Sequence, residues 1–187
     1  LQEIKTEDQN FPHDDFKKEG YYSYSSGQKS YNGVAIISKK ELKVSSSNFK
    51  DPLNQSRYIS AEIEYKKKIF SLISIYLPNG NPVNTDKYEY KKKWMDLFEK
   101  FIKTKFKKNK NIIITGDFNV IPSEEDVDNP EGWSNDALFK LEIRKKFRSL
   151  LTIGFKDGFR LFNKEAKQYT FWDYQQGSWQ RNKGLRI

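Results

Sequence analysis

Apolar residues in the first part of the chain follow the spacing of β-strands. Residues 21–25, 33–38 and 41–46 are short segments of this kind, and residues 57–65 and 69–76 form a predicted hairpin. The first arm of the hairpin alternates apolar and polar residues, which predicts one buried and one solvated face. The second arm is apolar on both faces, which is typical of a central strand.

The run from residue 111 to residue 115 contains three consecutive isoleucines and predicts a short strand that is covered on both faces. We expect Gly116 to end this strand and, lacking a Cβ atom, to let another backbone or a phosphate approach. Asp117 and Asn119 follow; if the chain stays extended, their side chains point the same way at a strand end, where α/β folds bind ligands. That pair suits a hard metal ion or a scissile phosphate. An Asx turn without chemistry is the alternative.

Helical spacing is clearest at residues 86–107, where an apolar stripe is expected to face the core and the lysines on the other face to be solvated. A second helix is predicted at residues 136–151, and a short one between Pro12 and Gly20. The stripe of the first helix contains Tyr90, Trp94, Leu97, Phe98, Phe101 and Ile102. The inward face of the second contains Leu138, Leu141, Phe147, Leu150 and Leu151.

The charge balance favours an anionic partner. The chain has 34 Lys and Arg against 25 Asp and Glu, a net charge of +9, which favours nucleic acid. It is also rich in Lys and Asn, so some lysines reflect coding bias. It has no cysteine, which excludes disulfides and thiol chemistry and suits a reducing compartment. The apolar runs are too short to span a bilayer, and we expect a cytoplasmic monomer without a membrane partner.

Isolated candidate residues have structural alternatives. An isolated Glu3 is usually a solvated carboxylate, and Tyr76 at a strand end is more often a core residue than a catalyst. His13, the single histidine, lies in a polar segment and is expected at the surface without a catalytic partner. Residues 169–187 place aromatic rings beside basic side chains, as expected where nucleic acid is bound. Two strands with core aromatics are the equal alternative there.

Seven motifs, in order along the chain, resemble those of the exonuclease III family of abasic-site DNA endonucleases, in the endonuclease/exonuclease/phosphatase superfamily. They are LQEIK at 1–5, YNGVAI at 31–36, YLPNG at 76–80, GDFN at 116–119, GFKDGFR at 154–160, YTFWDY at 169–174 and RNKGLRI at 181–187. GDFN is shared across the superfamily, whereas the last two motifs point to the DNA-repair branch. The resemblance implies one domain over residues 1–187 with an α/β (α+β) architecture, a DNase I-like two-sheet β-sandwich flanked by helices.

The same resemblance implies pieces that the sequence does not contain. Family members carry a strand with an asparagine before LQE, an aspartate directly after GLRI, and an Asp-His pair near the carboxyl terminus. We therefore expect a domain that is incomplete at both ends, less stable than its parent, and poorly active.

The implied function is that of a metal-dependent DNA repair nuclease, which hydrolyses the phosphodiester 5′ to abasic sites in double-stranded DNA and degrades it from 3′ ends. The resemblance implies that Glu3, Asp117 and Asn119 bind the metal, Mg²⁺ or alternatively Mn²⁺. It assigns activation of water to Asp117, and stabilisation of the phosphate in the transition state to Asn119 and Tyr76. The implied DNA-binding residues are Lys5, Asn79, Phe171, Trp172, Arg181, Asn182 and Lys183, with Phe171 lining the pocket for the base-less sugar.

Two other functions are compatible with parts of the pattern. A phosphatase or phosphodiesterase acting on small phosphates or lipids could use GDFN and the glutamate ligand equally well, although the basic charge and the RNKGLRI motif argue against it. A non-catalytic nucleic-acid-binding domain is the second alternative. Metal dependence separates it from a nuclease, because a pure binder retains DNA in chelator with an affinity that falls steeply with salt.

Overall fold

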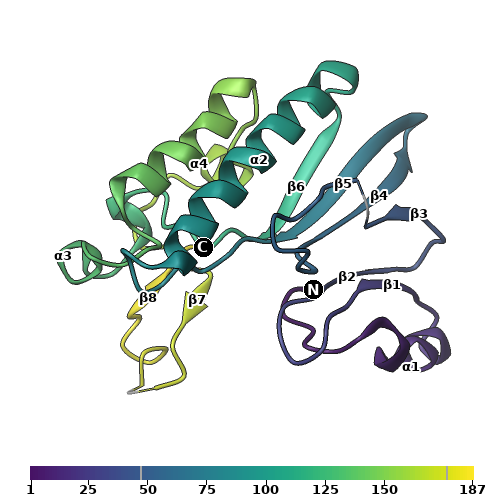
Figure 1. Ribbon diagram of the computed structural model, residues 1–187, viewed down its shortest axis with the longest axis horizontal. Helices are drawn as coiled ribbons and strands as arrows, with labels where there is room; N and C mark the ends of the chain where they lie inside the picture. Colours follow the sequence, from purple (N-terminus) through teal and green to yellow (C-terminus); the bar gives the residue numbers. More distant parts are fainter. Residues whose placement is uncertain (47, 176) are drawn as a thin grey trace. The chain divides into compact units, whose positions relative to one another are not determined.

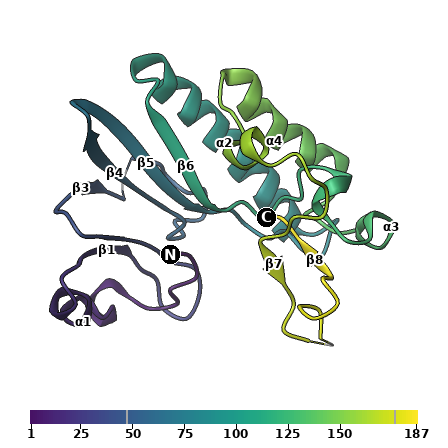
Figure 2. The ribbon, with the colours of Figure 1, turned by 180° about the vertical axis from the view of Figure 1, so that it is seen from behind.

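The computed structural model describes residues 1–46, 48–175 and 177–187 (Figures 1 and 2). Its contacts divide the chain into two compact units. Unit 1 comprises Leu1–Leu77 and Phe101–Phe118, and unit 2 comprises Pro78–Lys100 and Asn119–Ile187. The long helix α2 (Asp86–Lys108) contributes residues to both, and each unit contains a hydrophobic cluster of its own.

Unit 1 contains two β-sheets. The smaller sheet pairs β1 (Tyr22–Ser26) with β2 (Val34–Ser38) in antiparallel fashion. The larger has the order β3-β4-β5-β6, with β3 (Lys43–Ser45), β4 (Tyr58–Tyr65), β5 (Lys68–Tyr76) and β6 (Ile112–Asp117). Its first two pairings are antiparallel and the β5–β6 pairing is parallel. Two short helices, η1 (Asp8–Asn10) and α1 (His13–Lys18), precede the sheets.

The core of unit 1 lies between these sheets. Val34 and Ile36 from β2 pack with Ile59 and Ala61 from β4, and all are buried. Apolar faces of two sheets therefore meet, which is the arrangement of a sandwich. The predicted hairpin is confirmed: β4 and β5 are joined through Lys66 and Lys67, both with positive φ, the conformation of a type I′ turn.

Strand β6 differs from the expectation in two respects. It is not covered on both faces, because Ile113 is 49% exposed and burial alternates along the strand. The physical reason is that the smaller sheet packs on β4, two strands away from β6, so that no layer covers Ile113 on that face among the described residues. Gly116 also does not end the strand, which continues to Asp117. The close approach of another backbone to Gly116 is confirmed, because a Cβ at this position would lie 2.0 Å from the carbonyl oxygen of Ile75 on β5.

Unit 2 is built around helices. Helix α4 (Leu141–Ile153) lies beside the first part of α2 (Figures 1 and 2), and the hydroxyl groups of Tyr88 and Ser149 donate to Glu142 and Glu99 at 2.7 and 2.6 Å. The other elements are η2 (Glu124–Asp126), α3 (Pro130–Trp133), α5 (Gly158–Phe162), and the antiparallel pair β7 (Phe171–Trp172) and β8 (Gly184–Leu185). One core cluster contains Ile121, Val127, Leu138, Phe139 and Leu185.

The helix predictions were correct in kind and partly wrong in detail. The first long helix is confirmed, but Lys91 is completely buried on it rather than solvated. The second helix begins at Leu141, not at residue 136, and Leu141 is exposed. Asp136 is the cause of the late start, because its side chain accepts a hydrogen bond from the backbone N–H of Leu138 and closes a turn instead. No helix in the described ranges is long and apolar enough to cross a membrane.

We predict that Gly116→Ala destabilises unit 1 by about 3 kcal/mol, because the new methyl group would overlap β5 and an L-residue would be strained at a φ of 132°. Urea unfolding followed by circular dichroism measures the change. Gly158→Ala is the matched control, since nothing lies within 4 Å of its Cβ position. Equal stability of the two variants would contradict the close approach of β5 to β6.

Candidate active site

The LQEIK motif is held in unit 1 by hydrogen bonds to the YNGVAI motif. The backbone N–H groups of Ile4 and Lys5 donate to the carbonyl oxygens of Gly33 and Asn32 at 3.3 and 3.0 Å. Leu1 and Gln2 pair with β2, through hydrogen bonds between Leu1 and Ala35 and an antiparallel bridge between Gln2 and Val34. Glu3 and Lys5 have φ values of 51° and 52°, which a strand cannot accommodate. This irregular backbone fixes where Glu3 lies.

Four side chains gather around the end of β5. The hydroxyl group of Tyr76 donates to Oε1 of Glu3 at 2.8 Å, and Nζ of Lys5 lies 3.0 Å from Oε2 of the same carboxylate. The guanidinium of Arg57 lies over the Tyr76 ring at 4.7 Å and donates to the Tyr76 carbonyl oxygen at 3.1 Å. The carboxylate of Glu3 is thereby bound by a phenol and an amine.

The protonation states of this cluster follow from its contacts. Partial burial raises the pKa of Glu3, but hydrogen bonds from Lys5 and Tyr76 and the positive charges of Lys5 and Arg57 outweigh it, and the net pKa is lowered. Burial raises the pKa of Tyr76, and the hydrogen bond to Glu3 and the charges of Glu3 and Asp117 raise it further, against the opposing charge of Arg57. At neutral pH Glu3 is therefore ionised, and Tyr76 is a neutral hydrogen-bond donor.

Asp117 lies next to Tyr76 because the parallel β5–β6 ladder puts them in register. The backbone N–H of Leu77 donates to the Asp117 carbonyl oxygen at 2.9 Å, which extends the pairing by one bond. Unit 1 therefore brings together Glu3, Lys5, Tyr76 and Asp117 from three segments far apart in the sequence.

A divalent metal fits the chemistry of this donor set. Within the described ranges no three His, Cys, Asp or Glu side chains cluster as a ready-made metal cage. Mg²⁺ does not need such a cage, because it is commonly held by one or two carboxylates together with water and substrate phosphate. The ionised, partly exposed carboxylate of Glu3 is a suitable ligand of that kind, and Asp117 supplies a second carboxylate in the same unit.

Two amide side chains form the second group of candidate residues, in unit 2. Nδ2 of Asn79 donates to Oδ1 of Asn119 at 3.2 Å. Asn119 is 4% exposed and has a φ of 46°, so the chain is not extended there and the predicted same-side alternation with Asp117 does not apply. The amino group of Lys91 donates to the carbonyl oxygens of Asn79 and Asn119 at 2.9 and 2.6 Å.

A buried ion-pair cluster holds the RNKGLRI motif within unit 2. Asp126 is 1% exposed and accepts hydrogen bonds from Nη2 of Arg160 and Nε of Arg186, at 2.5 and 2.7 Å. Arg186 also reaches Asp157 at 2.8 Å. Burial raises the pKa of Asp126, but the hydrogen bonds from Arg186, Ser123 and Arg160 outweigh it and lower the pKa overall. Asp126 is therefore a fixed negative charge that both arginines share.

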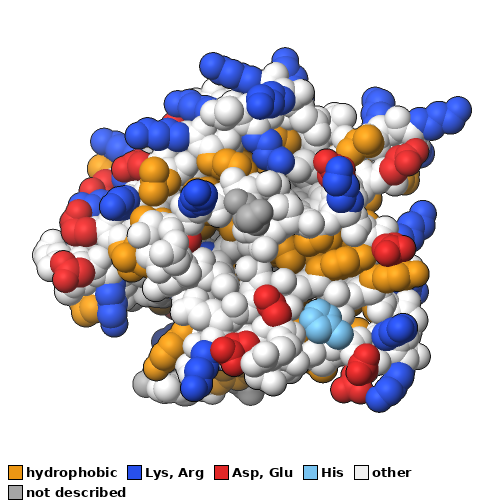
Figure 3. Space-filling view, turned by 45° about the vertical axis from the view of Figure 1, so that its right-hand side comes forward, with side chains coloured by type: hydrophobic (Ala, Val, Ile, Leu, Met, Phe, Trp, Pro, Cys, Tyr) orange, Lys and Arg blue, Asp and Glu red, His pale blue; other side chains and the backbone are white. Residues whose placement is uncertain are grey.

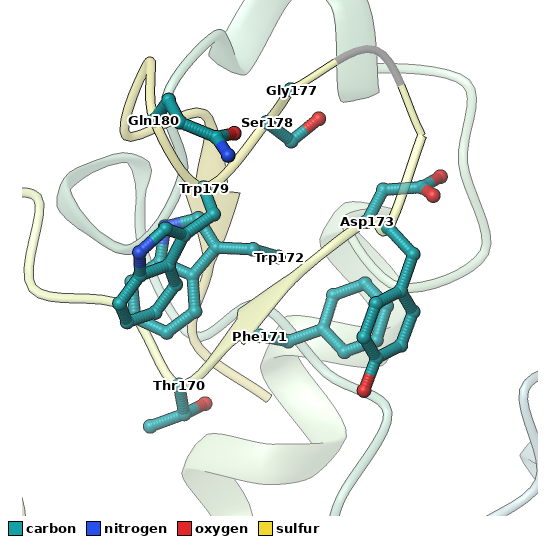
Figure 4. A pocket seen from close by; sticks show the side chains of 9 residues that line it. Thr170, Phe171, Trp172, Asp173, Gly177, Ser178, Trp179 and Gln180 are labelled. Atoms are coloured by element: carbon teal, nitrogen blue, oxygen red, sulfur yellow. The ribbon is translucent and has the colours of Figure 1, made fainter.

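An aromatic pocket of about 460 Å³ lies at the turn between β7 and β8. Trp172 and Trp179 lie against each other on one side of it, and Phe171 points to the other side (Figure 4). Nε1 of Trp172 donates to Oδ1 of Asn182 at 3.2 Å, and Phe171 is 41% exposed. Of the predicted DNA-binding residues here, Phe171 and Trp172 line the pocket, Asn182 contacts Trp172, and Arg181 and Lys183 are exposed.

His13 has partners that the sequence analysis did not foresee. Nδ1 of the ring lies 2.8 Å from the hydroxyl oxygen of Ser23, and Nε2 lies 3.4 Å from that of Ser25. Ser25 donates in turn to Asp8 at 2.6 Å. The histidine is half-buried and visible at the surface beside hydrophobic side chains (Figure 3). The expectation of a surface position is correct, and the ring in addition has two hydroxyl partners on β1.

Sequence reasoning missed two residues of these groups, Arg57 and Lys91. Arg57 is one of few arginines in a chain that otherwise uses lysine, which is a signal, since arginine is needed where a planar donor group must stack on a ring. Lys91 lies three positions from both Tyr88 and Trp94, and all three side chains are buried. Residues three positions apart lie on the same face of a helix. If the predicted apolar stripe had included Tyr88, Lys91 would have been placed on the buried face with it.

The sequence matches the model of a known protein family along its whole given length. The family model described as Endonuclease/Exonuclease/phosphatase family matches residues 1–187. The chain is 31% identical over 197 residues to exodeoxyribonuclease III of Haemophilus influenzae, and the match covers 100% of this chain and 74% of that protein. The chain is also 34% identical over 194 residues to Recombination repair protein 1 of Drosophila melanogaster. That match covers 100% of this chain but only 27% of that protein.

Solved structures agree with the fold. The 3′ phosphatase NExo from Neisseria, bound to a product DNA hairpin, is 31% identical with a TM-score of 0.91, and the match covers 100% of this chain and 72% of that one. An AP endonuclease from Archaeoglobus fulgidus is 32% identical with a TM-score of 0.89, with coverage of 99% and 71%. The predicted fold class, a mixed α/β sandwich flanked by helices, is confirmed.

We predict that Asp126→Asn lowers the free energy of unfolding by about 3 kcal/mol at pH 7, because it leaves two partly buried arginines without their shared carboxylate. The folded-state pKa of Asp126 lies below the ordinary value of 3.8. The stabilisation is therefore fully present above that pH and is lost as the pH falls below 3.8.

Urea unfolding of both proteins at pH 7 and at pH 3, followed by tryptophan fluorescence, measures this difference, which should shrink at the lower pH. Asp15→Asn is the matched control, because its ion pair with Lys18 is exposed and contributes little. A loss for Asp126→Asn that does not change with pH would contradict the prediction.

Proposed function

The chain belongs to the endonuclease/exonuclease/phosphatase family, and on that premise we propose that it is a metal-dependent DNA repair nuclease that hydrolyses the phosphodiester 5′ to abasic sites. Degradation of duplex DNA from 3′ ends is a second activity of the same site in this proposal. The relatives named exodeoxyribonuclease III and AP endonuclease support a hydrolase that acts on DNA.

The observation that carries the proposal is the arrangement at the carboxyl end of β5. Glu3 is ionised, the phenol of Tyr76 keeps its proton and donates to it at 2.8 Å, and Asp117 lies in register with Tyr76. A carboxylate that can hold a metal, a second carboxylate and a neutral donor are the groups that hydrolysis of a phosphodiester needs. Such a cluster has no comparable use in a domain that only binds nucleic acid.

Glu3 holds Mg²⁺ or Mn²⁺ in this proposal, with Asp117 and Asn119 as further candidate ligands. The cation supplies charge that offsets the negative charge of the phosphodiester, which otherwise repels a nucleophile. Lys5 and Arg57 keep Glu3 ionised, so that its carboxylate is available to the cation at neutral pH.

Asp117 orients the attacking water and accepts its proton. Asn119 donates a hydrogen bond to the phosphate oxygens as negative charge accumulates there, and Tyr76 does the same when its hydroxyl group turns from Glu3 to the phosphate. The raised pKa of Tyr76 is important for this role, because a phenolate could not donate and would repel the phosphate. Asn79, which donates to Asn119, fixes which way the Asn119 side chain points.

The substrate and partner are double-stranded DNA with an abasic site or a 3′ end. Lys5, Asn79, Arg181, Asn182 and Lys183 are proposed to contact the DNA, and the pocket of Phe171 and Trp172 to receive the base-less sugar. Extrusion of an abasic nucleotide costs little, because no base has to be unstacked. The protein acts as a monomer in the cytoplasm in this proposal.

The first test incubates the full-length protein with a duplex containing one abasic-site analogue, in Mg²⁺ and then in chelator. A single metal-dependent cut on the 5′ side of the analogue is the expected result. A duplex that stays uncut in Mg²⁺ but still binds to the protein in chelator would identify a nucleic-acid-binding domain. Hydrolysis of phosphorylated small molecules with no cut in DNA would identify a phosphatase of the same family.

We predict that Asp117→Asn lowers the rate of incision at least 1,000-fold, roughly the loss seen when a catalytic group of this kind is removed, with little change in DNA affinity. Incision is measured on the abasic duplex in Mg²⁺, and affinity by fluorescence anisotropy in chelator. Asp15→Asn, which makes the same charge change on exposed helix α1, should behave like the wild type. Retained cleavage by Asp117→Asn would refute the assignment.

We predict that Phe171→Ala reduces the preference for the abasic duplex over an intact duplex about tenfold, because burial of a phenylalanine side chain against the sugar is worth roughly 1.5–3 kcal/mol. Competition between the two duplexes in chelator measures the preference. Phe162→Ala is the control, since Phe162 is 91% exposed and does not line the pocket. An unchanged ratio would remove Phe171 from the sugar pocket.

A further inference from the structure

Lys91 is a buried lysine that the proposed chemistry does not use. Its side chain is completely buried on the inward face of α2, although lysine is among the residue types least often found there. Its amino group donates to the carbonyl oxygen of Asn79 at 2.9 Å and to that of Asn119 at 2.6 Å. One side chain thus joins the loops of the YLPNG and GDFN motifs within unit 2.

Asn119 is held by hydrogen bonds to both its side chain and its backbone carbonyl group. Asn119 has a left-handed backbone with a φ of 46°, a conformation that asparagine adopts more readily than most residues and that local hydrogen bonds stabilise further. Its side chain accepts the hydrogen bond from Nδ2 of Asn79 at 3.2 Å. The two residues are therefore joined twice, by their amide side chains and by their carbonyl groups through Lys91.

The YLPNG loop is shaped to admit the lysine. Gly80 has a φ of 84°, and a Cβ at that position would lie 2.5 Å from Cδ of Lys91. The glycine next to Asn79 thus leaves room for the stem of the lysine side chain. Asn81 continues the network, since its backbone N–H donates to Oδ1 of Asn79 at 3.2 Å.

We propose that Lys91 is a positioning residue, which holds the backbones of Asn79 and Asn119 so that their amide side chains meet in one fixed orientation. This inference rests on the proposed function of Asn119 as a donor to the phosphate. Because Lys91 is completely buried, it acts through the two asparagines in this proposal. Without its amino group, two carbonyl groups lose a donor and Asn119 is free to leave its left-handed conformation.

The test is the single-turnover rate of incision by Lys91→Met in the full-length protein, with enzyme in saturating excess over the abasic duplex in Mg²⁺. Such a rate is a property of the folded enzyme and does not depend on how much of the protein is folded. We expect it to fall about 100-fold, as misplacement of a catalytic group by about 1 Å can do. The dissociation constant for the duplex in chelator should change less than twofold.

Two controls isolate the position of Lys91. Lys93→Met removes an exposed lysine from the same helix and should retain the wild-type rate. Ile143→Ala empties a fully buried site on α4 and should lower the melting temperature as Lys91→Met does, but leave the single-turnover rate unchanged.

Lys91→Gln, which keeps one amide as donor, is the second variant should Lys91→Met not fold. Its rate should lie between those of Lys91→Met and the wild type.

A double-mutant cycle shows whether Lys91 acts through Asn119. If it does, Lys91→Met combined with Asn119→Ala should be no slower than Asn119→Ala alone, because the residue to be positioned is already gone. Losses that multiply would refute action through Asn119.

Chemical rescue provides a further readout, because residues 1–187 contain no cysteine of their own that would be alkylated. Lys91→Cys is alkylated with bromoethylamine in denaturant and refolded, which restores an amino group at nearly the original length of the side chain. The rate should recover at least tenfold relative to the unalkylated variant, with wild-type protein taken through the same treatment as the reference. A variant that refolds after alkylation but stays slow would count against the proposal.

The outcomes separate this inference from the proposed function. A wild-type protein that leaves the abasic duplex uncut in Mg²⁺ overturns the proposed function and the positioning role with it. A wild-type protein that cuts, beside a folded Lys91→Met that cuts at the same single-turnover rate, overturns the positioning role alone.

Discussion

The parallel pairing of β5 with β6 is the constraint on which the candidate site in unit 1 depends. It puts Tyr76 in register with Asp117, and the close approach of Gly116 to the carbonyl oxygen of Ile75 is possible only for a residue without a Cβ. The phenol of Tyr76 then has one carboxylate beside it in the sheet, and it reaches Glu3, which the irregular LQEIK segment supplies.

In unit 2, the backbone carbonyl groups of Asn79 and Asn119 need hydrogen-bond donors from outside a sheet. Asn79 and Asn119 lie beyond the ends of β5 and β6, so their carbonyl groups have no ladder partners, and carbonyl groups shielded from water must find donors. The amino group of Lys91 provides one donor to each loop. The helix that carries Lys91 is therefore both a packing element and the support of the two asparagines.

Much of the fold could be predicted from the sequence because its elements are encoded locally. The alternation in residues 57–65, the helical spacing after residue 86 and the order of the motifs correctly indicated β4, α2 and the fold class. The exposed face of Ile113, the partners of His13 and the buried position of Lys91 were missed for one reason. Each depends on which element covers which face, and that is set by tertiary packing, which a local pattern does not contain.

The arginines show how position carries more information than net charge. In a chain where lysine is the common cation, Arg57 stacks on Tyr76, and Arg160 and Arg186 share the buried carboxylate of Asp126. These three sites need a planar group with several fixed donors, which lysine cannot provide. Several lysines, by contrast, are bound to carboxylates of the chain itself, as Lys5 is to Glu3. The net charge of +9 does not say which cations are engaged in this way, so the contacts of the individual cations, rather than their number, indicate where DNA would bind.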